Sequence, residues 1–386
     1  MFKSFSLTTV VAGFIAVLVG FTSSAVIIFQ AASAAGASPA EVSSWLAALG
    51  IGMGVTSIGL SLRYRMPVLT AWSTPGAALL VTSLAGVPMS AAIGAFVFSA
   101  ILITLCGVTG LFEKMMDRIP KGLAAAMLAG VLVHFGLNVF SAMQSQLLLA
   151  LAMFVTYLIA KRVTPRYAII LVLAMGVIIA GAKGLLHFDN VTLAVAQPVW
   201  TTPTFDLTTL IGVGIPLFVV TMASQNVPGV AVIRASGYNM PISPLITWTG
   251  VASLVLAPFG GYALNLAAIT AAICMGKEAH EQPEKRYMAS IWAGFFYLIT
   301  GIFAATIAGL FAAFPKELVL TIAGLALFTT ISNSMAMAMH DDRQREPALI
   351  TFLITASGLT LFSIGSAFWG LIGGVLAMLV LNWGKR

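Results

Sequence analysis

Long runs of apolar residues recur from one end of the chain to the other, separated by short polar stretches. A run of about 20 apolar residues can cross the ~30 Å hydrocarbon core of a bilayer as a helix. The first run is interpreted as a retained span and not a cleaved leader. This pattern predicts an all-α polytopic membrane protein with fourteen spans. They are expected at 8–30, 43–62, 68–85, 89–108, 119–138, 145–161, 167–182, 208–233, 244–258, 262–275, 287–312, 317–339, 347–360 and 362–383.

The third span cannot be one continuous helix. Pro67 opens it, and the residues that follow, up to Trp72, favour extended backbone. Two hydroxyl residues suited to cap a helix come next, and a Pro-Gly pair then suits the first turn. We therefore expect a short extended piece and a half-helix that begins at membrane depth, which lipid tolerates only where protein buries it or a cavity adjoins it. The residues at this break are Trp72, Ser73, Thr74, Pro75 and Gly76.

The tenth span shows the same arrangement. Pro258 and two glycines end a helix, Tyr262–Asn265 can be extended, and a half-helix is expected to restart near Leu266 and Ala267. This span is the third of the second seven, as the first break is the third of the first seven. Because seven is odd, the two halves have opposite orientations in the membrane, which predicts an inverted repeat. The expected halves are 1–195, with spans one to seven, and 196–386, with spans eight to fourteen.

Polar residues also interrupt the first span of each half. Ser23 and Ser24 lie in the middle of span one, where hydroxyls either line a site or pack one helix against another. Gln225 and Asn226 lie in span eight, next to Pro228. Two neighbouring carboxamides are costly in lipid without partners, so we expect them to line a polar site.

The composition excludes a soluble domain, and the distribution of basic residues predicts the orientation of the chain in the membrane. The chain is 60% hydrophobic and 8% charged, with a mean hydropathy of +1.03. If the N-terminus is cytoplasmic, all of the 19 Lys and Arg residues except Lys183 and Lys316 fall on the cytoplasmic side. Both termini are therefore expected in the cytoplasm. The net charge of +7 reflects this topology, and no nucleic-acid partner is expected.

No acidic residue falls in the middle of an expected span, so a carboxylate relay for protons or cations is not indicated. The two half-helix N-termini carry partial positive charge and favour a small anion, whose apolar body Trp72 or Tyr262 can flank. His134 in span five is either a proton carrier or a packed, hydrogen-bonded residue. Cys106 and Cys274 fall in separate spans, and no metal spacing, phosphate loop or catalytic triad occurs. No metal, cofactor or enzymatic chemistry is expected.

Several stretches resemble the benzoate/proton symporter (BenE) family of bacterial inner membranes. They are Thr70–Leu80, Met222–Gly229, Thr355–Leu361 and Gly365–Gly370, and the likeness extends over essentially the whole chain. That family is similar in architecture to the uracil and xanthine permeases and to sulfate and bicarbonate exchangers. The resemblance implies a core domain from 1–110 and 207–312 and a gate domain from 118–183 and 316–384. It also implies import of an aromatic carboxylate with a proton, by movement of the core against the gate, and by analogy a homodimer.

Carried onto this sequence, the resemblance puts Ser73–Gly76 at one half-helix end and Asn265, Leu266 and Ala267 at the other, with Gln225 and Asn226 from span eight. The nucleobase permeases are similar but carry a glutamate in span eight, so the carboxamides here argue against a nucleobase. The proton is then shared by the substrate's own carboxylate or by His134. The alternatives are a uniporter or exchanger of another small organic anion or of a nucleobase-like substrate on the same fold, a lipid-acting membrane enzyme, or a channel.

Overall fold

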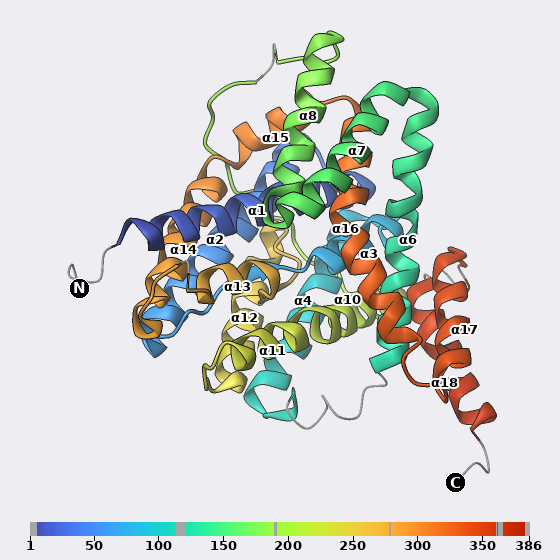
Figure 1. The fold of residues 1–386 in the computed structure, drawn as a ribbon. Coiled ribbons are helices and arrows are strands. Elements are labelled where there is room, and N and C mark those ends of the chain that lie inside the picture. Colours follow the sequence, from blue (N-terminus) through green and yellow to red (C-terminus); the bar gives the residue numbers. More distant parts are fainter. Residues whose placement is uncertain are drawn as a thin grey trace.

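The computed structural model describes residues 6–112, 121–188, 191–277, 279–359, 361 and 366–382. The chain is mostly helical, with two short strands at its centre (Figure 1). Within the described residues, six helices are long and apolar enough to cross a membrane, or up to eight if each of two bent pairs is one span. Residues 113–120, together with Thr360 and Gly365 of the C-terminal motif, lie outside the described residues.

The first half of the chain contains the first break. Ser38 begins α2 with a capping box, in which its hydroxyl accepts from the Glu41 backbone and the Glu41 side chain accepts from the Ser38 backbone. The elements are α1 (Leu7–Ala34), α2 (Pro39–Tyr64), β1 (Thr70–Trp72), α3 (Thr74–Ser83), α4 (Met89–Val108), α6 (Lys121–Ser145), α7 (Leu147–Val163), η2 (Pro165–Tyr167) and α8 (Ala168–Ala182).

The second half begins where Asp206 caps α9, and the Thr209 backbone N–H and hydroxyl hold the pKa of Asp206 below its usual value. The elements are α9 (Leu207–Thr209), η3 (Leu210–Gly214), α10 (Ile215–Thr221), η4 (Met222–Asn226), α11 (Val227–Ala235), α12 (Ile242–Leu256), η5 (Ala257–Phe259), β2 (Leu264–Leu266), α13 (Ile269–Met275), η6 (Pro283–Lys285), α14 (Tyr287–Ile302), α15 (Ala304–Ala312), α16 (Lys316–Ala338), α17 (Arg345–Ala356) and α18 (Ser366–Leu381).

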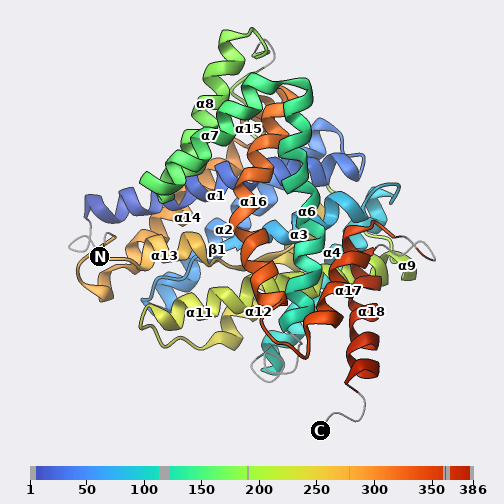
Figure 2. The same ribbon diagram turned by 45° about the vertical axis from the view of Figure 1, so that its right-hand side comes forward.

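The helices pack mainly in two groups. In one group, α1 packs on α3, α13 and α14, α2 on α14, and α4 on α12. In the other, α6 packs on α16 and α17, α7 on α8, and α17 on α18. Figure 2 shows α6 and α16 side by side, with α17 and α18 beside them. The two groups meet where α1 touches α16 and α8, and where α3 and η4 touch α6.

Glycines let α2 and α14 pack with their backbones in contact. A Cβ atom at Gly50 would lie 2.7 Å from the Gly301 Cα, and one at Gly54 would lie 2.8 Å from the Gly294 carbonyl oxygen. Small residues spaced four apart allow this approach between helices in a membrane. Since α2 precedes β1, this contact fixes the position of the helix that leads into the first strand.

The expected break in span three is confirmed, whereas one detail of the second half is wrong. Span eleven is expected as one helix over 287–312, but the chain bends by 68° between Pro283–Ile302 and Ala304–Ala312. Span eight is expected at 208–233, and one apolar helix runs over Leu207–Arg234, through the π-helical turn η4. Pro228 does not interrupt it, because Pro228 lies in the first turn of α11, directly after the π-helical turn.

Candidate functional site

The two chain breaks meet in an antiparallel pair of three-residue strands. Thr70 lies opposite Leu266, and Trp72 lies opposite Leu264. Two further backbone bonds extend the pair, from the Ser73 N–H to the Ala263 oxygen (3.0 Å) and from the Ala267 N–H to the Leu69 oxygen (2.9 Å). Every residue of β2 is buried. Backbone that is not helical is therefore satisfied within the protein, as a membrane requires.

Ser73 connects the first break to three other segments. Its hydroxyl accepts from the Gly76 backbone N–H (3.1 Å) and so caps α3, and it also accepts from the Thr221 hydroxyl of α10 (3.1 Å). The Tyr262 hydroxyl donates to the Ser73 carbonyl oxygen (3.0 Å). Ser73, Thr221 and Tyr262 are all fully buried. Thr74 and Pro75 follow Ser73, and Thr74 is half-buried while Pro75 is buried.

Hydroxyls of α2 hold the start of β1. The Thr70 hydroxyl hydrogen-bonds with the hydroxyls of Thr56 (2.7 Å) and Ser57 (2.9 Å). It also donates to the Met53 carbonyl oxygen (3.1 Å). The Ser57 hydroxyl accepts from the Thr70 N–H (3.0 Å). Ser61 holds Val68 in the same way. These bonds fix the strand to a rigid helix, which keeps the first break at one position.

Trp72 bridges the first break and α1. Its indole N–H donates to the Ser24 hydroxyl (2.8 Å), which in turn donates to the Gly20 carbonyl oxygen (2.7 Å). The Trp72 ring packs edge-on against Phe21, with 4.8 Å between ring centres. The side chain of Ser23, the other serine expected in the site, lies outside the described residues.

The two carboxamides of η4 face the second break. The Asn226 Oδ1 atom accepts from the Leu266 backbone N–H (2.9 Å), and Asn226 is fully buried. The Gln225 Oε1 atom accepts from the Asn265 amide (3.3 Å), and Gln225 is half-buried. The structure thus brings both carboxamides to β2, the segment with which the sequence analysis grouped them.

Two polar groups at this point have spare hydrogen-bonding capacity. The Asn265 amide donates to Gln225 and to the Leu266 oxygen, and its Oδ1 atom is buried with no partner within the described residues. The Gln225 NH₂ group likewise has no protein acceptor in the described part of the chain. Because an unpaired polar group away from water is unfavourable, the buried Asn265 Oδ1 atom favours a polar ligand, and the half-buried Gln225 NH₂ group can donate to the same ligand.

The second half-helix begins later than expected. Leu266 lies in β2, Ala267 follows it, and α13 begins at Ile269 with Ala268 as its uncapped N-cap residue. The strand bonds hold Leu266 and Ala267 extended, so they are not at the helix end. Because the strands are antiparallel, α3 and α13 leave the pair at opposite ends. Ser73, the N-cap of α3, lies opposite Ala263, five residues before Ala268, the N-cap of α13, so the two N-termini are roughly 17 Å apart along the strand.

Tyr262 and His134 lie in surroundings that differ from a ligand pocket. Tyr262 is fully buried and packs near Trp45 and Phe96, with ring centres 6.5 and 6.1 Å away. His134 is on the exposed side of α6, and its Nε2 atom is 2.8 Å from the Ala356 carbonyl oxygen of α17. The structure therefore does not bring His134 to the chain breaks.

The residues that meet at the breaks form one polar, uncharged group, which we call the central cluster. None of its side chains ionises near neutral pH. An uncharged surrounding makes the helix N-terminus of α3 the main local source of positive potential, and this end of a helix favours anions. The members of the central cluster are Ser24, Trp72, Ser73, Gln225, Asn226 and Asn265.

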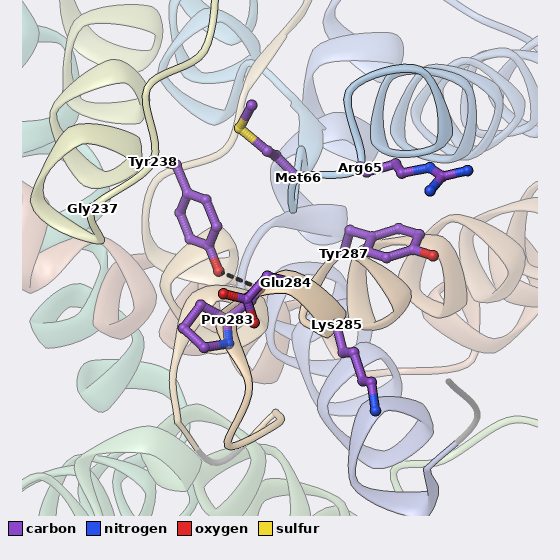
Figure 3. A pocket seen from close by; sticks show the side chains of 8 residues that line it. All are labelled: Arg65, Met66, Gly237, Tyr238, Pro283, Glu284, Lys285 and Tyr287. Atoms are coloured by element: carbon purple, nitrogen blue, oxygen red, sulfur yellow. Dashed lines mark hydrogen bonds between the residues drawn. The ribbon is translucent and has the colours of Figure 1, made fainter. Parts of the chain in front are cut away.

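A separate cavity of about 580 Å³ contains the charged residues Arg65, Glu284 and Lys285 (Figure 3). Figure 3 shows that the Arg65 and Lys285 side chains extend in different directions, and that the Tyr238 hydroxyl bonds the Pro283 oxygen. Burial is the main factor that raises the pKa of Tyr238. No residue of the central cluster lines this cavity. Its cations do not converge on one point, so it is a poor site for a single carboxylate.

Sequence reasoning missed the residues that support the breaks from other helices. Thr221 holds Ser73, and Ser253 of α12 accepts from the Leu264 N–H (2.8 Å). Met53 accepts from the Trp72 N–H through its sulfur (3.2 Å). One signal was present for Thr221, which lies four residues before Gln225 and so on the same helix face. The partners of Ser253 and Met53 depend on helix packing and leave no local signal.

Comparison with known proteins identifies the family. The family model for the benzoate membrane transport protein matches residues 3–380. The chain belongs to this family. It is 50% identical over 374 residues to "Inner membrane protein YdcO" of Escherichia coli strain K12, which covers 97% of this chain and 96% of that protein. It is 42% identical over 379 residues to the "Benzoate membrane transport protein" of Acinetobacter baylyi, which covers 98% and 96%.

Solved structures share the fold at low sequence identity. The overall structure of SLC26A9 matches with a TM-score of 0.64 and 11% identity, over 97% of this chain and 66% of that one. The transmembrane domain of the cyanobacterial bicarbonate transporter BicA matches with a TM-score of 0.57 and 11% identity, over 98% and 97%. The expectation of a membrane transporter of the benzoate transport family, and not an enzyme, is confirmed.

Proposed function

We propose that this protein imports benzoate or a related aromatic monocarboxylate by binding it at the central cluster. The single observation that carries the proposal is an uncharged polar cluster at two chain breaks, in a chain of the benzoate transport family. The substrate's carboxyl group lies near the first turn of α3, and the NH₂ group of Gln225 donates to its carbonyl oxygen. The aromatic ring lies beside Trp72, which Phe21 already contacts.

The proton is carried by the substrate's carboxyl group in this proposal. The central cluster has no carboxylate to accept it, and His134 bonds to α17 instead. The unpaired Asn265 Oδ1 atom is an acceptor that can receive a hydrogen bond from a protonated carboxyl. Import of the acid in this form moves one proton with each substrate molecule.

Transport follows from movement of one helix group against the other. The proposed core comprises 1–110 and 207–312, and the proposed gate comprises 118–183 and 316–384. The main packing within each group of helices, and the breaks that meet inside the first group, support this division. Fourteen spans in two inverted halves, with both termini in the cytoplasm of a bacterial inner membrane, complete the proposal.

Uptake of labelled benzoate into proteoliposomes tests the substrate. The external pH is held at 6.5 and the internal pH at 7.5, so that passive entry of the neutral acid stays small and protein-free liposomes give the background. Saturable uptake that exceeds this background and falls when an ionophore collapses the proton gradient is expected. Absence of saturable uptake with or without the gradient would reject benzoate as the substrate.

The same vesicles separate symport from exchange. An exchanger needs unlabelled benzoate inside the vesicles before labelled benzoate can enter, whereas a proton symporter also takes up label into empty vesicles when a proton gradient is imposed. Uptake that depends on preloading and ignores the gradient would support the exchanger and reject proton symport.

A further inference from the structure

The loop of residues 276–286, which joins α13 to α14, contains a buried cation. Arg286 is the residue directly before α14, and it is only 7% exposed. Among the described residues, no carboxylate oxygen lies within 4.0 Å of its guanidinium group. Since a buried charge without polar partners is very unfavourable, the guanidinium has to be satisfied by groups of another kind.

Three backbone carbonyl groups accept hydrogen bonds from the Arg286 side chain. The acceptors are Met275 (Nη1, 2.9 Å), His280 (Nε, 2.7 Å) and Glu281 (Nη2, 3.3 Å). Met275 is the last residue of α13, and the last carbonyls of a helix have no partner within it. The next residue, Gly276, is extended, so no left-handed glycine closes this helix end. Arg286 therefore caps the C-terminus of α13, where the helix dipole also favours a cation.

The other end of α13 lies beside the second break. The helix has seven residues, which is about 10 Å of helix, and it begins three residues after Leu266 of β2. Its N-cap residue, Ala268, makes no side-chain cap bond. Strand pairing thus holds one end of this short helix and Arg286 holds the other, and Asn265 of the central cluster belongs to the strand.

The same loop also holds the helix that follows the two carboxamides. Tyr238, three residues after the end of α11, donates its hydroxyl to the Pro283 carbonyl oxygen of the loop (3.0 Å) (Figure 3). The positive charge of Arg286 limits the rise that burial causes in the pKa of Tyr238, so the two side chains are close. At the opposite end of α11, a Cβ atom at Gly229 would lie 2.7 Å from the Leu266 Cβ atom. The helix α11 therefore contacts β2 at one end and the loop at the other.

The loop thus joins the far ends of two helices whose near ends meet at the central cluster. At the near ends, the Asn265 amide donates to Gln225 (3.3 Å). At the far ends, Arg286 holds α13, and Tyr238 holds the segment after α11. The helix α14 starts directly after Arg286 and packs on α2, whose hydroxyls hold β1. Arg286 therefore connects α13 to the helix pair that positions the first break.

We propose that Arg286 is a positioning residue for the substrate, because it holds α13 and so sets the position of Asn265 relative to Gln225. The inference rests on the proposed function, in which these two side chains bind the carboxyl group. Arg286 itself does not touch the substrate. Lysine replaces the charge but not the planar fork that reaches three carbonyls, so Arg286→Lys should keep part of the effect.

Uptake kinetics in proteoliposomes test this role. Arg286→Met should raise the KM for benzoate about 2–10-fold, the worth of one misplaced hydrogen bond, with a smaller change in the maximal rate per folded protein. Arg286→Lys should give an intermediate KM. Lys285→Met removes the neighbouring charge, which is half-buried and lines the separate cavity, and should leave the KM unchanged. A normal KM in Arg286→Met with less folded protein, or an equal rise in both Met variants, overturns the proposal.

Hydrogen exchange measured by mass spectrometry tests the same link without a substrate. The Leu266 and Ala267 amides are hydrogen-bonded and buried, so they should exchange slowly. Arg286→Met should speed exchange of a peptide that contains both amides and leave a peptide of α17 unchanged. Failure of benzoate uptake by the wild-type protein would reject the proposed substrate, whereas faster exchange in β2 would still support its positioning by Arg286. Unchanged exchange in β2, or equal acceleration in α17, overturns that positioning.

Discussion

Gln225 and Asn226 are neighbours in the chain but accept hydrogen bonds from different kinds of group, a side-chain amide and a backbone N–H. Asn226 accepts from a backbone N–H of β2, so it supports the fold of the break. Gln225 hydrogen-bonds to the Asn265 side chain, and its NH₂ group has no protein acceptor in the described part of the chain. Under the proposed function, the two adjacent carboxamides therefore differ in role, Asn226 supporting the fold and Gln225 binding the substrate.

Replacement of each carboxamide by Leu should separate these roles. Gln225→Leu should lower benzoate uptake at least tenfold and change thermal stability less than Asn226→Leu does, because the ligand's donor is lost together with one long side-chain bond, from the Asn265 amide (3.3 Å), at a half-buried position. Asn226→Leu should destabilise the protein by about 1–3 kcal/mol, because the buried Leu266 N–H loses its acceptor. Thermal unfolding in detergent and uptake in proteoliposomes measure the two effects. Unchanged uptake by Gln225→Leu would remove Gln225 from the proposed site.

At the scale of elements, the sequence predicted where the helices break better than it predicted which residues of other helices hold the breaks. Ser73 and the Pro-Gly pair after it form a local cap signal, so the start of α3 was predictable. The start of α13 was not, because Ala268 offers no capping side chain and strand pairing holds Leu266 extended. The bond between Trp72 and Ser24 depends on which helices lie side by side, and no local pattern encodes that.

The contact between α2 and α14 predicts a sharp difference between two glycines of α2. Gly50→Leu should destabilise the protein by about 1–3 kcal/mol or prevent its folding, because the new Cβ atom would press on the Gly301 backbone at 2.7 Å. Gly59→Leu has nothing within 4 Å and is the matched control. Thermal unfolding of both variants checks this, and equal stability would contradict a close backbone contact at Gly50.

At the scale of the whole molecule, the uneven distribution of basic residues predicts an orientation of the chain in the membrane. The segment 183–206 before α9 contains one basic residue, Lys183, whereas the turn before α14 contains Lys285 and Arg286. The charge pattern therefore predicts that these two segments lie on opposite sides of the membrane.

Labelling of intact cells tests this orientation. A membrane-impermeant maleimide should label Leu193→Cys in intact cells and should label Gln282→Cys only after the cells are permeabilised. The wild-type protein, whose two cysteines are buried, is the blank. The reverse pattern would place both termini outside and contradict the proposed topology.

The paired strands carry one more consequence. Their bonds join residues from opposite halves of the chain, and separation of the strands would leave backbone amides unpaired in the interior of the protein, at a cost of about 1–3 kcal/mol for each group. Neither break can thus shift alone during a transport cycle. In a genetic selection, second-site suppressors of a damaging change in β1 should arise in β2 or beside it, although nearly two hundred residues separate the two strands in the sequence.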